Sequence, residues 1–124
     1  MGIKVRLDKL VRYWGSSYVI DKTDNYMVKQ VKIKPEQRTM LQYHDERDEV
    51  WVVVQGHGLA WHVNSFSEIV PESIGPSDTL KVLAGYPHRI ENKSPLEDLV
   101  LIKIQIGEPV EDEDIISVAD DWGR

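Results

Sequence analysis

The stretch QYHDERDEVWVVVQG, residues 42–56, decides the fold of this chain. Its second part, residues 49–54, is an apolar, β-branched run that begins at a carboxylate and stops before Gly56, which is typical of a buried strand. Its first part carries Gln42 and His44 two residues apart. Side chains at i and i+2 of an extended segment point to the same face, so these two can converge on one point.

The rest of the chain continues this pattern of short strands separated by turn residues. Alternation with a period of two predicts further strands at residues 26–34, 59–63, 80–83 and 99–106. The last of these carries only aliphatic side chains on one face: Val100, Ile102, Ile104 and Ile106. Helical candidates are confined to residues 4–12 and a turn at 113–117. The prediction is an all-β fold, an antiparallel sandwich or barrel, in a single domain of residues 1–124.

Composition limits the possible functions. The chain has 124 residues, enough for one compact domain with its own core. Its net charge of −6 argues against a nucleic-acid partner, which needs a clustered basic face. It has no cysteine and no apolar run near the ~18 residues that span a bilayer. The first 15 residues are charged throughout and lack an apolar leader, so we expect a cytoplasmic protein that does not bind membranes.

Four side chains with nitrogen or oxygen donors could meet at one ion. Glu49 follows His44 by five residues, and His88 lies far downstream in GYPHRIEN, residues 85–92. Two imidazoles, a carboxylate and an amide oxygen suit Zn, with Mn, Fe, Co or Ni as alternatives. Each residue taken alone has an ordinary structural explanation. Taken together, they predict one divalent metal ion held by Gln42, His44, Glu49 and His88.

The spacing of these residues resembles the two motifs of the cupin family. Glu49 and Gly56 are seven residues apart, as in the first motif. Gly85, His88 and Asn92 match the GxxHxxxN part of the second motif. The resemblance implies a cupin, an antiparallel double-stranded β-helix or jelly-roll barrel, with the metal inside it.

A more specific resemblance extends along nearly the whole chain. It rests on the segments RYWGS (12–16), VK (28–29), IKPEQR (33–38), LQYH (41–44), EVWVVV (49–54), PHRIEN (87–92) and DDWGR (120–124). In this order and spacing they resemble the C-terminal isomerase domain of type II mannose-6-phosphate isomerases, often fused to mannose-1-phosphate guanylyltransferase. That family uses glutamine where Gln42 stands. The resemblance implies a stand-alone cupin enzyme that interconverts mannose 6-phosphate and fructose 6-phosphate.

Such an aldose–ketose isomerisation needs a Lewis acid and a general base near the carbons that exchange a proton. The metal would supply the first. Lys29 shares strand parity with Val31 and Ile33, so it is a candidate base inside the barrel; a lysine reaching the barrel mouth is the alternative. Arg38 and Arg89 are candidates for the substrate phosphate, because a guanidinium matches phosphate oxygens, although each could equally form a surface ion pair.

Departures from the family keep two other functions open. Ser117 stands where the family usually has arginine, which favours a non-catalytic metal-containing cupin that binds sugars or nucleotide sugars. The other alternative is an Fe(II) oxygenase, which Gln42 disfavours. His57, between two glycines, and His62, on the strand face opposite Trp61, are left outside the predicted site.

The N-terminal part of the chain predicts a homodimer. Cupins of this size commonly pair N-terminal strands, which is an argument from fold analogy. Trp14, Tyr18 and Val19 provide an apolar stretch that could serve this contact.

Overall fold

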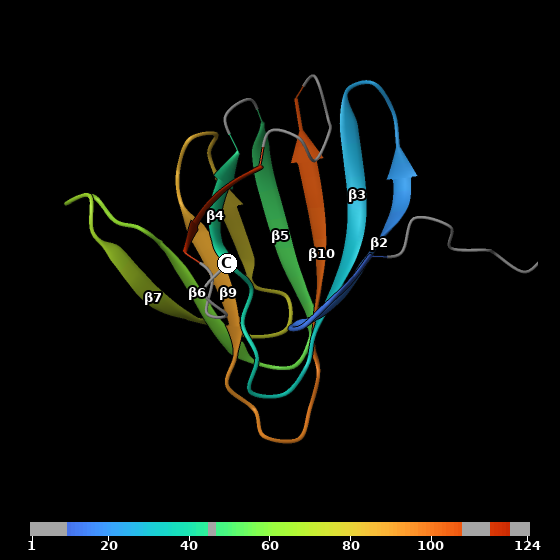
Figure 1. Ribbon diagram of the computed structural model, residues 1–124, viewed down its shortest axis with the longest axis vertical. Coiled ribbons are helices and arrows are strands. Elements are labelled where there is room, and N and C mark those ends of the chain that lie inside the picture. Colours follow the sequence, from blue (N-terminus) through green and yellow to red (C-terminus); the bar gives the residue numbers. More distant parts are fainter. Residues whose placement is uncertain (1–9, 45–46, 108–114, 120–124) are drawn as a thin grey trace, which may run out of the picture.

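Two antiparallel sheets face each other in the computed structural model (Figure 1). The model describes the backbone of residues 10–44, 47–107 and 115–119, and the side chains of residues 10–42 and 47–107. The six-stranded sheet runs β1 (Leu10–Arg12), β2 (Gly15–Lys22), β3 (Tyr26–Ile33), β10 (Leu99–Ile106), β5 (Asp48–Gln55), β8 (Thr79–Val82). The five-stranded sheet runs β11 (Ile115–Ala119), β4 (Leu41–His44), β9 (His88–Asn92), β6 (Gly58–Val63), β7 (Ile69–Ile74).

The all-β, antiparallel prediction is confirmed, and the helical candidates are wrong where they can be compared. Leu10–Arg12 forms β1, which pairs with β2 across a tight turn that brings Arg12 opposite Gly15. Ile115–Ala119 forms β11, which pairs with β4. In both places pairing with a neighbouring strand overrides a weak local helix preference. Within the described residues no helix is long and apolar enough to cross a membrane.

The interior between the sheets is apolar at one end of the strands and polar at the other. The buried apolar cluster draws on both sheets and contains Trp14, Val31, Ile33, Trp51, Val53, Ala60, Ile74, Val82, Ile90, Leu99 and Leu101. Along β10 the inward side chains change from Leu99 and Leu101 to Lys103 and Gln105. β5 changes in the same direction, from Val53 to Glu49. The packed core therefore supports one end of the same strands that carry polar side chains at the other.

The outer face of the six-stranded sheet carries the aliphatic row that the sequence singled out. Val100, Ile102 and Ile104 do share a face of β10, but the inward face is the alternate one. At one position of that outer face the cross-strand partners are also apolar, since Ile104 pairs with Val28 on β3 and Val50 on β5. Strand periodicity identifies two faces and leaves open which one is buried.

Gly56 closes the turn between β5 and β6 against the chain that leads into β10. Its φ angle is +85°, and a Cβ built there would lie 2.6 Å from the backbone oxygen of Asp98. Both the dihedral angle and the close approach require glycine. The first cupin motif thus ends in a residue with a packing role.

We expect Gly56→Ala to lower the free energy of unfolding by more than the ~1 kcal/mol typical of alanine at positive φ, because the methyl group also collides with a backbone oxygen. Gly85→Ala is the matched control: its φ is +84°, and no described atom lies within 4 Å of its Cβ position. Urea unfolding midpoints of the two variants give the comparison. Equal destabilisation would contradict the packing role of Gly56.

Candidate functional site

The centre of the polar end is the carboxylate of Glu49, whose residue has no exposed surface. Its Oε1 accepts a hydrogen bond of 3.0 Å from Nε1 of Trp51, and its Oε2 accepts one of 3.0 Å from Nε2 of Gln105. Nε2 of His88 lies 3.1 Å from Oε1, and Nζ of Lys103 lies 3.8 Å from Oε2. A buried carboxylate is tolerated only when neighbours compensate its charge, and these four side chains do so.

Strand register brings these groups together from distant parts of the sequence. Gln105 lies opposite Glu49 on the neighbouring strand, and Lys103 lies opposite Trp51. In the other sheet, His88 on β9 lies opposite Gln42 on β4. Directly opposed residues of an antiparallel pair have side chains on the same face, so each pair points into the barrel together.

Trp51 contacts both the imidazole of His88 and the ammonium of Lys103. Its ring meets that of His88 edge-on, with centroids 6.0 Å apart and an interplanar angle of 63°. Nζ of Lys103 lies 4.8 Å from the centroid of the same ring. Aromatic rings attract cations over their faces, so the indole fixes Lys103 beside Glu49.

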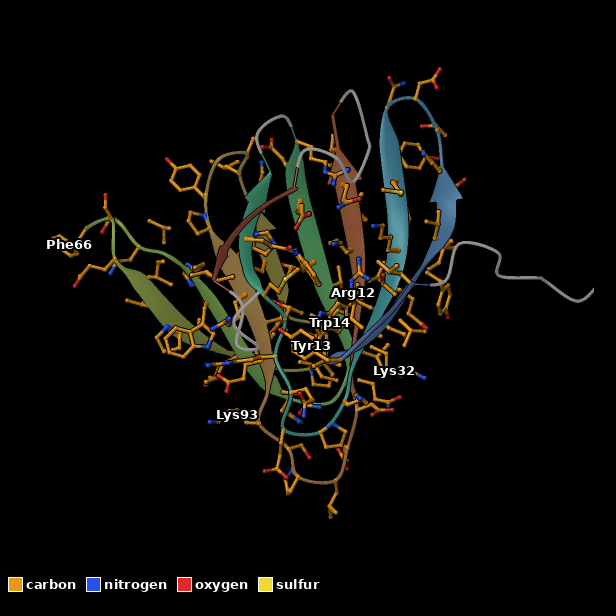
Figure 2. All side chains as sticks on the ribbon, in the orientation of Figure 1. Arg12, Tyr13, Trp14, Lys32, Phe66 and Lys93 are labelled. Atoms are coloured by element: carbon orange, nitrogen blue, oxygen red, sulfur yellow. The ribbon has the colours of Figure 1, made fainter. Side chains whose placement is uncertain are left out.

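A pocket of about 270 Å³ opens onto this cluster. Its lining comes from both sheets and consists of Leu10, Arg12, Trp14, Ser17, Lys29, Val31, Thr39, Met40, Gln42, Trp51, His88 and Lys103. Three of these side chains are cationic: Arg12, Lys29 and Lys103. Figure 2 shows Arg12 beside Trp14, whereas Lys32 points outward. Among the described side chains the lining has no carboxylate, so this part of the pocket favours an anionic ligand.

The arrangement fits a divalent metal. The 3.1 Å between Nε2 of His88 and Oε1 of Glu49 matches the ~3.0 Å expected for two adjacent ligands each bound about 2.1 Å from one ion. Gln42, opposite His88, offers an amide oxygen on the same side. The side chain of His44, the fourth predicted ligand, lies outside the described residues. Among the described side chains, no three His, Asp, Glu or Cys residues form a metal-binding group, and His44 stays a predicted ligand.

Lys29 lies where strand parity placed it. It is 6% exposed, lines the pocket and stands opposite Lys103 on β10. Arg38 and Arg89, by contrast, do not line this pocket. Arg89 is buried, with its Nε donating a 2.8 Å hydrogen bond to the backbone oxygen of Thr39. The role of both arginines in phosphate binding stays a prediction without support from the pocket lining.

Two cationic pocket residues, Arg12 and Lys103, were not among the predicted site residues. Arg12 belongs to the RYWGS segment, which was read only as a family match. Lys103 shares strand parity with Leu101 and Gln105, and a lysine in the middle of an apolar strand is an available signal. Neither the location of the pocket nor the inward face of β10 could be read from periodicity.

His57, His62 and Asn92 do not line this pocket. His62 stands opposite His88 on β6 and has its Nε2 2.8 Å from Oε2 of Glu72. His57 is exposed. Asn92, of the second motif, is buried, and its Nδ2 donates hydrogen bonds to the backbone oxygens of Ile33 and Glu97. Asn92 therefore holds the loop after β9 against β3, which is a structural role.

The family model for the mannose-6-phosphate isomerase C-terminal domain matches residues 4–120. The chain belongs to this family. The predicted recognition is thereby confirmed.

Curated relatives carry this domain as a small part of a longer protein. The chain is 33% identical to mannose-1-phosphate guanylyltransferase of Escherichia coli K12 over 118 residues, which is 94% of this chain and 23% of that protein. The chain is also 32% identical to the xanthan biosynthesis protein XanB of Xanthomonas campestris. That match covers 94% of this chain and 24% of XanB. The chain thus spans about a quarter of the length of these relatives.

Solved structures confirm the cupin fold. Oxalate decarboxylase from Bacillus subtilis superimposes with a TM-score of 0.78 at 14% identity, over 89% of this chain and 29% of that one. The capsular polysaccharide assembling protein CapF from Staphylococcus aureus gives 0.75 at 24% identity, over 90% of this chain and 34% of that one. At these identities the likeness concerns the fold alone.

Proposed function

We propose that the chain is a metal-dependent phosphosugar isomerase that interconverts mannose 6-phosphate and fructose 6-phosphate. The observation that carries the proposal is the contact between His88 and the buried carboxylate of Glu49 at the base of a cationic pocket. Membership of the mannose-6-phosphate isomerase C-terminal family supports the same substrate class.

Gln42, His44, Glu49 and His88 would hold one divalent ion, with Zn first and Mn, Fe, Co or Ni as alternatives. Such an ion would act as a Lewis acid toward the sugar oxygens. Trp51 and Gln105 hold the carboxylate of Glu49 in place through one hydrogen bond to each oxygen. A fixed carboxylate costs no reorganisation when substrate binds, which favours catalysis.

The pocket suits a small anionic sugar. Its volume of about 270 Å³ is slightly below the ~300–1,000 Å³ typical of ligand pockets, which favours a monosaccharide over a nucleotide sugar. Arg12 supplies positive charge for a phosphate, and Lys29 is the candidate group for moving the proton between the two reacting carbons. Ser17 and Thr39 add hydroxyl groups for the sugar.

A second candidate is a binding cupin without catalysis. β11 places Ser117 directly opposite Gln42, so the position where the family usually has arginine adjoins a predicted metal ligand. Loss of a cation there would leave binding in place and weaken chemistry. An Fe(II) oxygenase is the weaker alternative, because Gln42 departs from a three-histidine set. The cytoplasmic location and the single-domain boundary at residues 1–124 stay predictions.

We expect the purified protein supplied with Zn, Mn, Co, Ni or Fe(II) to convert mannose 6-phosphate to fructose 6-phosphate, and His44→Ala to abolish turnover by removing a metal ligand. A coupled assay of fructose 6-phosphate measures this, with stoichiometric metal binding measured in parallel. A protein that binds one metal but turns over none of the substrate would favour the binding cupin, and metal-dependent oxygen consumption would favour the oxygenase.

We expect Arg12→Met to raise the KM for mannose 6-phosphate by about tenfold or more, since a charge-assisted hydrogen bond contributes about 1.5–3 kcal/mol. Lys29→Met should instead lower kcat, because it removes the candidate proton-transfer group. Lys32→Met, on the exposed outer face of β3, removes the same charge outside the pocket and should leave KM unchanged. Steady-state kinetics give the comparison. A larger increase in KM for Arg38→Met or Arg89→Met than for Arg12→Met would indicate that Arg38 or Arg89 binds the phosphate instead.

We also propose a homodimer, through a surface other than the one the sequence suggested. Trp14 and Tyr18 are each 8% exposed, so they are buried within the chain and offer no free apolar patch. The outer face of the six-stranded sheet instead presents half-buried aliphatic side chains, including Val28, Val50 and Ile104. A second copy that covers this face would remove it from water.

Sedimentation equilibrium should therefore give twice the chain mass of 14.3 kDa. Ile104→Asp should shift the mass toward that of one chain, because it places a charge in the proposed interface. Phe66→Asp, at the exposed tip between β6 and β7 (Figure 2), should leave it unchanged. A mass of one chain at micromolar concentration in the unaltered protein would contradict the proposal.

A further inference from the structure

The charge of Glu49 is compensated by an internal ammonium on the side of the carboxylate that His88 does not approach. Nζ of Lys103 lies 3.8 Å from Oε2, and the two side chains are 8% and 1% exposed. His88 approaches the other oxygen, Oε1, at 3.1 Å. The carboxylate therefore has a cation on one side and a predicted metal ligand on the other.

Lys103 is held in this position by its surroundings. Its backbone lies opposite Trp51, and its Nζ lies 4.8 Å from the centroid of the Trp51 ring. Lys29 stands opposite it on β3, so a second cationic chain occupies the same row of the barrel wall. Removing the ammonium from this site would leave the Glu49 carboxylate buried without this compensation, which is strongly destabilising in proteins.

A divalent ion bound to Glu49 would meet this ammonium at short range. The repulsion energy between two like charges is inversely proportional to the distance between them. Salt screens this repulsion poorly at a buried site. The two cations also compensate the same single negative charge. Metal binding at Glu49 thus comes at the expense of the existing contact with Lys103.

We propose that Lys103 is the counter-cation of Glu49 in the metal-free protein and competes with the divalent ion for that carboxylate. Lys103 thereby keeps the metal-free barrel stable and weakens the metal site. This inference rests on the metal site of the proposed function and is independent of which sugar is the substrate. A lysine that only positioned Glu49 for the metal would have the opposite effect on affinity.

The test is the dissociation constant for Zn²⁺, measured by competition with a chromophoric chelator, in the unaltered protein and in Lys103→Met. Methionine keeps the length and the contact with Trp51 but removes the charge. We expect Lys103→Met to bind Zn²⁺ at least about tenfold more tightly. Lys32→Met, exposed on the outer face, is the control for the loss of one positive charge and should leave the affinity within about twofold.

Thermal unfolding gives a second readout that does not depend on activity. Metal-free Lys103→Met should unfold at a lower temperature than the unaltered protein, and saturating Zn²⁺ should raise its Tm by more than it raises that of the unaltered protein. Lys103→Gln, which keeps a polar end group, serves if the methionine variant does not fold without metal.

The outcomes separate this inference from the proposed function. Unchanged or weaker Zn²⁺ binding by the Lys103 variants, in a protein that binds the metal, would overturn the competition and leave the metal site standing. If the Lys103 variants bind Zn²⁺ and the unaltered protein does not, the result would support the strongest form of the competition. Absence of Zn²⁺ binding in every variant would overturn both the competition and the metal site.

Discussion

The buried carboxylate of Glu49 lies between two sheets, and the arrangement of the barrel follows from the need to compensate its negative charge. Each oxygen of Glu49 accepts one hydrogen bond, from Trp51 on its own strand and from Gln105 on the next. An imidazole from the opposite sheet and an ammonium from β10 also lie within 4 Å of the carboxylate. These groups come from positions 49 to 105 of the chain, so the site exists only when the strand register is correct. The fold and the site are therefore specified by the same pairings.

The division of each strand into an apolar and a polar half explains how one small barrel provides both stability and a reactive interior. Leu99 and Leu101 pack at one end of β10, whereas at the other end Lys103 lines the pocket and Gln105 donates a hydrogen bond to Glu49. The buried cluster needs no polar partner and sets the spacing of the sheets. Polar groups at the open end are then held by a rigid frame, which keeps them at fixed distances from one another. A loose barrel would lose the 3.1 Å approach of His88 to Glu49 before it lost its secondary structure.

Much of this architecture could be predicted from the sequence, and the failures have a common physical cause. Period-two alternation located β3, β5, β6, β8 and β10 but not β2 or β7. The spacing around Glu49 and His88 selected the cupin motifs. Alternation could not tell which face of β10 is buried, because both faces carry aliphatic side chains. For that reason Lys103 was overlooked. The arginines chosen for phosphate binding were selected by chemistry alone, and only the three-dimensional pairing shows that Arg12, at the far end of the chain, reaches the pocket instead.

The central claim is that the cluster around Glu49 is a metal centre. The most direct measurement is anomalous diffraction from crystals grown with Zn²⁺ or Mn²⁺ and recorded at the absorption edge of the metal. The account predicts one strong peak about 2.0–2.3 Å from both Oε1 of Glu49 and Nε2 of His88, with Gln42 and His44 completing the coordination. At saturating metal, the absence of a peak there, or a peak at another site alone, would contradict it.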